Sequence, residues 1–211
     1  TDAQMYAAMV EMVDRQLGEI MALLRELKID NNTIVFMCGD NGGQPYFKNE
    51  RHPHGFLAPN LNPKTGERFR GGKGNFYEGG LRIPFLARWP GKIKAGTVSA
   101  HVGYFGDLMS TWAELAGVKP PAGLDSRSIV PTLLGRGEQT KHDYLYWEFY
   151  EGGVSQAVLL GDRWKGIRLK SPTAPMALYD LVTDLGERTD VAGKNPERVA
   201  RIAEIMRTAR F

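Results

Sequence analysis

The 211 residues carry a net charge of only +3, with basic and acidic side chains interspersed along the chain. This weak, mixed charge gives little support to nucleic acid or a membrane surface as partner, and no apolar run approaches the roughly 20 residues that span a bilayer. With 42% hydrophobic residues, the chain can build a sizeable core. The single cysteine, Cys38, excludes an internal disulfide framework.

The N-terminal half is predicted to alternate a helix and strands. Apolar residues at helical spacing predict an amphipathic helix over 6–27. The apolar, β-branched run 33–37 predicts a strand buried on both faces, as in a parallel sheet covered by helices. Residues 42–77 show no periodicity, and a connection of this length is usually functional or disordered. A further strand is predicted over 81–89, although Pro84 argues against a central, fully paired position.

The C-terminal half is predicted to contain a helix, a series of short strands and a final helix. Asp107 is placed to cap a helix over 107–115. Beyond it, short alternating runs separated by glycine turns predict an antiparallel meander with strands at 144–150, 154–160, 164–170 and 177–181. Asn195-Pro196 begins a last helix. We therefore expect two domains, an α/β portion over 1–138 and a small antiparallel-sheet subdomain over 139–211.

Two polar residues follow directly on the first predicted strand. Asp40 and Asn41 lie at its C-terminal end, where ligands gather in α/β sheets. A carboxylate beside an amide oxygen suits a hard divalent cation such as Ca²⁺ or Mg²⁺. Gly42 and Gly43 would leave room for a ligand. A plain Asp-Asn-Gly turn is the alternative interpretation.

A lysine between glycines is the second candidate. Lys73 lies in the sequence RGGKG at 70–74, where the glycines allow close approach to a ligand and the ammonium offers a compact charge to an oxyanion. The spacing matches neither a Walker A nor a Rossmann pattern, so nucleotide phosphate is not the expected ligand. A solvated loop lysine is the alternative interpretation.

The order of these motifs resembles the second half of the formylglycine-dependent (type I) sulfatases, including arylsulfatases, of the alkaline-phosphatase-like superfamily. The matching motifs are DNG at 40–42, GGKG at 71–74, EGGLRIPF at 78–85 and WPG at 89–91. Weaker matches extend over nearly the whole chain, with Asp14 in the first helix, DSRS at 125–128, WK at 164–165 and LYDL at 178–181.

The resemblance implies a fold, an activity and roles for residues. The fold is α/β: part of an alkaline-phosphatase-like sheet sandwiched by helices, followed by a small antiparallel sheet with a C-terminal helix. The activity is hydrolysis of a sulfate monoester on a small molecule or a glycan. Asp40 and Asn41 are implied to ligate Ca²⁺ or Mg²⁺, and Lys73 to act in catalysis by contacting the sulfate or its bridging oxygen. The family's compartments are periplasmic, secreted or lysosomal.

Four further residues in the same region carry open alternatives. His52 and His54, in the long connection, are candidates for substrate binding, with exposed loop histidines as the other interpretation. Glu78 is expected either to orient Lys73 or to cap a turn. Arg82 is expected to form a structural ion pair rather than to touch substrate.

The departures from the family pattern are as informative as the matches. The nucleophile signature, Cys-x-Pro-x-Arg or Ser-x-Pro-x-Arg, is absent, and Cys38 cannot replace it because Gly39-Asp40 follows. The family's N-terminal metal-binding aspartates also have no counterpart, and the opening residues contain neither an initiator Met nor a secretion signal. We therefore expect the N-terminal part of the same sulfatase, with its formylglycine, as a partner, and no activity from this segment alone.

Two other functions remain open from the residues. A phosphate or phosphonate ester hydrolase of the same superfamily is one, although such relatives commonly carry Asp-His where this chain has Asp40-Asn41. A pseudo-sulfatase fragment that binds without catalysis is the other. An upstream sequence without the nucleophile signature would favour it.

Overall fold

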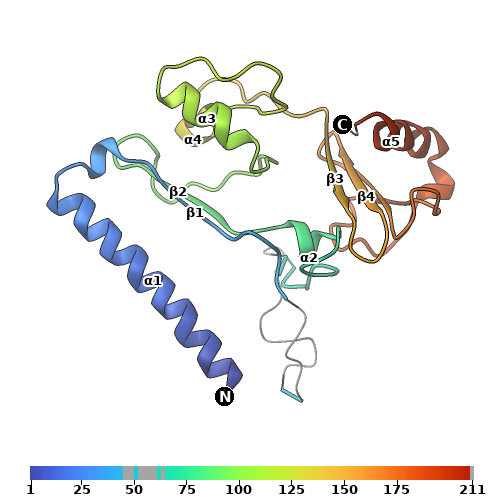
Figure 1. The fold of residues 1–211 in the computed structure, drawn as a ribbon, viewed down its shortest axis with the longest axis horizontal. Helices are drawn as coiled ribbons and strands as arrows, with labels where there is room; N and C mark the ends of the chain where they lie inside the picture. The colour runs from blue at the N-terminus through green and yellow to red at the C-terminus, as the bar shows by residue number, and fades with distance from the viewer. Residues whose placement is uncertain (45–49, 52–60, 63–64, 210–211) are drawn as a thin grey trace. The chain divides into compact units, whose positions relative to one another are not determined.

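The computed structural model describes residues 1–44, 50–51, 61–62 and 65–209. Figure 1 shows the chain as a ribbon. Two compact units are present, one formed by Thr1–Cys38 with Pro84–His142 and the other by Gly39–Ile83 with Asp143–Phe211. The second unit therefore combines the connection that follows the first strand with the C-terminal sheet. The domain boundary expected at 138/139 stays a prediction.

The first unit begins with the expected long helix. Helix α1, Asp2–Glu26, starts at a capping box in which the Thr1 hydroxyl accepts from Gln4 N. None of its residues is buried among the described residues. Its exposed apolar side chains include Met5, Met9, Val10, Ile20 and Leu23. The apolar face predicted from the sequence is thus present and uncovered in this chain.

The first strand pairs differently from the prediction. Strand β1, Val35–Cys38, pairs antiparallel with β2, Phe85–Arg88, as a two-stranded sheet. The expected parallel, doubly buried strand is therefore wrong in this chain, since the residues of β1 are half-buried or exposed. An apolar run shows that both faces of a strand carry apolar side chains. It does not fix the direction of the neighbouring strand.

The second predicted strand is shorter than expected. Residues 81–89 were expected to be extended throughout, but Glu78–Leu81 form a short helix, α2, and β2 begins only at Phe85. Pro84, just before β2, has no N–H to donate to a ladder. The proline thus stands at the boundary where pairing starts.

Two short helices complete the first unit. The predicted helix is confirmed as α3, Asp107–Leu115, and α4 spans Val130–Leu134. Asp107 does not cap α3 as predicted. Its buried carboxylate instead accepts from Tyr104 N at 3.1 Å and Arg127 N at 2.8 Å, and it lies 2.8 Å from Nε2 of His142. This carboxylate therefore links the turn before α3 to Arg127 and His142.

The second unit contains the predicted meander. Strands β3 (Tyr144–Phe149), β4 (Ser155–Leu160), β5 (Trp164–Arg168) and β6 (Ala177–Asp180) pair antiparallel in chain order. Helix α5, Pro196–Thr208, covers this sheet. The core between them consists of Val158, Met176, Leu178, Ile202, Ile205 and Met206. Short turns, η1 at Asp30–Asn32 and η2 at Ala192–Lys194, complete the elements.

No helix within the described ranges is long and apolar enough to cross a bilayer.

Candidate functional site

The predicted site residues lie on two loops of the second unit that are joined through their backbones. Asp40 and Asn41 follow β1, and both are exposed, as is Lys73. Lys73 N donates to Gly43 O at 2.8 Å, and Gly42 N donates to Gly80 O at 3.0 Å. The turn that carries the two candidate metal ligands is thereby hydrogen-bonded to the loop that carries Lys73, the candidate oxyanion-binding residue.

The short helix α2 supports both loops. Gly79 N donates to Arg70 O at 2.8 Å, which ties α2 to the start of the lysine loop. A Cβ on Gly80 would lie 2.2 Å from Asn75 O, and one on Gly42 would lie 1.9 Å from Gly79 O. The glycines at these two positions are therefore a packing requirement. The expectation that Gly42 leaves room for a ligand is wrong, because a backbone carbonyl occupies that room.

We expect Gly42→Ala to destabilise the full-length protein by about 1–3 kcal/mol, since the added methyl overpacks a contact between two backbones. Thermal unfolding would measure the loss. Gly193→Ala in the same unit is the matched control, because a Cβ there meets no atom within 4 Å and the backbone needs no positive φ. Equal melting temperatures for the two variants would contradict this packing role.

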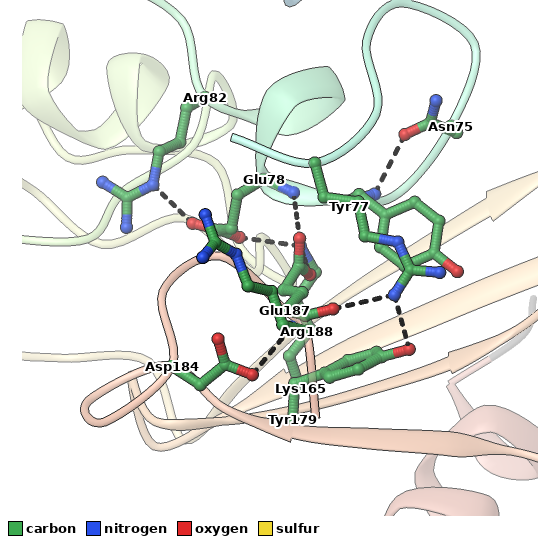
Figure 2. A network of polar contacts seen from close by, with 10 residues as sticks. Asn75, Tyr77, Glu78, Arg82, Lys165, Tyr179, Asp184, Glu187 and Arg188 are labelled. Carbon is green, nitrogen blue, oxygen red and sulfur yellow. Dashed lines mark hydrogen bonds and ion pairs between the residues drawn. The ribbon is translucent and has the colours of Figure 1, made fainter. Parts of the chain in front are cut away.

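A buried network of charges holds the first residue of α2. Lys165 of β5 is 0% exposed, and its Nζ lies 2.7 Å from Glu78 Oε1 and 2.9 Å from Glu187 Oε1. Glu78 N donates to Glu187 Oε2 at 2.6 Å, and Arg82 pairs with the other oxygen of Glu78. Figure 2 shows these side chains converging beneath α2.

The two carboxylates respond oppositely to their surroundings. Burial by itself would raise the pKa of Glu78, but the adjacent Lys165 and Arg82 outweigh it and hold the pKa below its usual value. Burial raises the pKa of Glu187, against the attraction of Lys165. Glu187 also has a φ of +54°, in the left-handed region that non-glycine residues rarely occupy. Glu187 thus combines two unfavourable features, a buried carboxylate and a left-handed backbone.

Arg70 connects the start of the lysine loop to the same network. Its guanidinium lies 3.9 Å from the centroid of the Tyr77 ring. Its Nη1 donates to Glu187 O at 2.7 Å and to the hydroxyl of Tyr179 at 3.1 Å. The loop that carries Lys73 is therefore anchored on both sides of the lysine.

The outcomes for the other candidates differ. Arg82 forms the structural ion pair that was predicted. The carboxylate of Glu78 contacts Lys165 and Arg82, and Glu78 is the first residue of α2. His52 and His54 lie outside the described residues.

Sequence reasoning missed Lys165 and Glu187 as part of this site. The available signal was a lysine inside the apolar strand run WKGI at 164–167, since a lysine is almost never fully buried unless it is paired.

The donor set after β1 fits a hard cation in part. Asp40 and Asn41 offer adjacent carboxylate and amide oxygens, both exposed, of the kind Ca²⁺ and Mg²⁺ bind. Within the part of the chain that the structure describes, no three His, Cys, Asp or Glu residues cluster as a metal site. Because Ca²⁺ takes about 6–8 oxygens, this pair would need further ligands.

Comparisons with known proteins find matches over nearly the whole chain. The family described as Sulfatase matches residues 2–118, and the one described as N-sulphoglucosamine sulphohydrolase, C-terminal, matches residues 67–209. N-acetylgalactosamine-6-sulfatase of Canis lupus familiaris is 37% identical over 74% of this chain, and steryl-sulfatase of Mus musculus is 35% identical over 95%. The solved structure of Ps i-CgsB in complex with k-i-k-neocarrahexaose is 27% identical over 98% of the chain, with a TM-score of 0.79.

These matches confirm the predicted fold class. The chain spans 27% of the canine protein, 35% of the mouse protein and 43% of the solved structure. It thus corresponds to under half the length of each.

Proposed function

Since this chain belongs to the sulfatase family, we propose that it supplies part of the active site of an enzyme that hydrolyses a sulfate monoester. The observation that carries the proposal is the hydrogen bond from Lys73 N to Gly43 O, 2.8 Å long. It links the turn bearing Asp40 and Asn41 to the loop bearing Lys73. A candidate cation-binding pair and a lysine on loops joined through their backbones suit an oxyanion such as a sulfate ester.

Each residue has a distinct role in this proposal. Asp40 and Asn41 would hold Ca²⁺ or Mg²⁺, which when bound supplies positive charge beside the sulfate. The ammonium of Lys73 binds a sulfate oxygen or the bridging oxygen and stabilises the negative charge that develops as the ester bond breaks. Neither group attacks sulfur, and a covalent route needs a nucleophile. The family's formylglycine, outside these 211 residues, is the nucleophile we propose.

The same proposal accounts for the uncovered apolar surface of the first unit. The side chain of Leu86 in β2 is 58% exposed, and that of Met9 in α1 is 57% exposed. Apolar surfaces of this kind mark contact sites in soluble proteins. We propose that the N-terminal part of the same sulfatase covers them.

The proposed substrate is a sulfated sugar. Two of the similar proteins bear names that refer to sugars, an N-acetylgalactosamine-6-sulfatase and a complex with a neocarrahexaose. The steryl-sulfatase provides the competing substrate class. Assays of the full-length protein with N-acetylgalactosamine 6-sulfate, a steroid sulfate and an aryl phosphate would separate the possibilities. Faster turnover of the phosphate would favour the phosphate ester hydrolase instead.

We expect Asp40→Ala in the full-length protein to lower metal content and sulfatase activity together, because the site loses its anionic ligand on this loop. Metal analysis after dialysis and turnover of an aryl sulfate are the two measurements. Glu204→Ala is the control, because this carboxylate lies on α5 and pairs with Arg207. Normal metal stoichiometry and normal activity in Asp40→Ala would rule out the metal assignment.

A further inference from the structure

We infer that Lys165 and Glu187 are positioning residues for Lys73, acting through α2 and the loop 70–80. The inference rests on the proposed function, since it assumes that Lys73 acts on the sulfate. Neither residue would touch substrate, because both are fully buried.

Glu187 holds the lysine loop on both sides of Lys73. Its side chain accepts from Glu78 N at 2.6 Å, and its backbone carbonyl accepts from Nη1 of Arg70 at 2.7 Å. Arg70 precedes Lys73 and Glu78 follows it. One residue of the C-terminal segment therefore fixes both ends of the segment that presents the ammonium.

Lys165 holds α2 in place through Glu78, the first residue of that helix. Its Nζ contacts both Glu78 at 2.7 Å and Glu187 at 2.9 Å, so it holds the two carboxylates together. From α2, Gly79 N bonds Arg70 O and Gly80 O accepts from Gly42 N. A displacement of α2 would thus shift the loop of Lys73 and the neighbouring turn, while the strands of the sheet stay paired.

Stability alone is a weak explanation for this arrangement. Removing charges from water is costly, and apolar residues of similar volume often stabilise a core equally well or better than a buried ion pair does. The two residues paired with Lys165 across the sheet, Leu159 and Tyr179, are buried, so an apolar side chain could occupy the same position. A left-handed backbone at Glu187 adds a further cost. Such costs are typical of sites where geometry matters more than stability.

The test is Lys165→Met in the full-length protein, assayed with an aryl sulfate. We expect kcat to fall about 10-fold or more while metal content stays normal, because a small misplacement of a catalytic group is costly. A double-mutant cycle with Lys73→Ala separates positioning from general damage. If Lys165 acts through Lys73, Lys165→Met should lower kcat by less than about twofold in the Lys73→Ala background.

Arg163→Met is the matched control. Arg163 precedes β5 and pairs with Asp180 at 2.7 Å, so it is a cation at the same sheet whose ion pair lies within the meander. We expect its kcat to be unchanged. If Lys165→Met does not fold, Glu187→Gln replaces it in the cycle, because the amide keeps an acceptor for Glu78 N but loses the charge that pairs with Lys165.

The outcomes distinguish this inference from the proposed function. Normal kcat in Lys73→Ala would overturn the proposed function. A large loss in Lys73→Ala with normal kcat in both Lys165→Met and Glu187→Gln would overturn the positioning role alone. Additive losses in the cycle would also overturn it, since they would show that the network acts independently of Lys73.

Discussion

Replacing Lys73 by alanine in the full-length protein is expected to lower kcat for sulfate ester hydrolysis by on the order of 10²-fold or more. In the proposed role the ammonium is a charge beside the reacting group, so its loss should destabilise the transition state more than the bound substrate. The structure holds Lys73 through its backbone N–H, 2.8 Å from Gly43 O, and alanine retains that donor. The fold should therefore survive the change.

Lys73→Arg provides the sharper comparison. Arginine keeps the positive charge but spreads it over a planar fork, which fits a site shaped for a compact ammonium poorly. We therefore expect little recovery of kcat. Melting temperature and metal content should match the unsubstituted protein in both variants. Kinetics of Lys73→Ala equal to those of the unsubstituted protein would return Lys73 to the interpretation as a solvated loop residue.

Local patterns in the sequence predicted the elements well. Helix α1 and the meander follow from periodicities that are written in consecutive residues. The pairing of β1 could not be predicted from such periodicities, because the direction of a neighbouring strand depends on residues far along the chain. Val35 lies opposite Arg88, for example.

The candidate site divides in the same way. Asp40, Asn41 and Lys73 could be proposed from the sequence because each stands in a short motif. The residues that support them were not, because Lys165 lies 87 residues after Glu78, and Glu187 lies 117 residues after Arg70. Only burial distinguishes Lys165 from the many exposed lysines, and burial of a charge becomes visible only when its partners are placed. The close backbone contacts of Gly42 and Gly80 likewise become visible only when the carbonyl groups that approach them are placed.

Residues 1–211 alone are expected to show no sulfatase activity, even with Ca²⁺ present. The chemical reason is that a cation and a lysine stabilise charge, whereas the family's covalent route needs a nucleophile that this sequence does not contain. The structural reason is the uncovered surface of the first unit. Helix α1 buries none of its residues within the described structure, and β1 and β2 form a sheet of only two strands.

Exposed apolar faces and unpaired strand edges favour aggregation. We therefore expect the isolated segment to aggregate, or to stay soluble only when an N-terminal segment carrying the nucleophile signature is supplied in trans. The experiment expresses the segment alone, assays an aryl sulfate, and then adds that complement. Restored turnover that disappears with Lys73→Ala would support the proposed division of the site. Turnover by the isolated segment would contradict it and would require a nucleophile among its own residues.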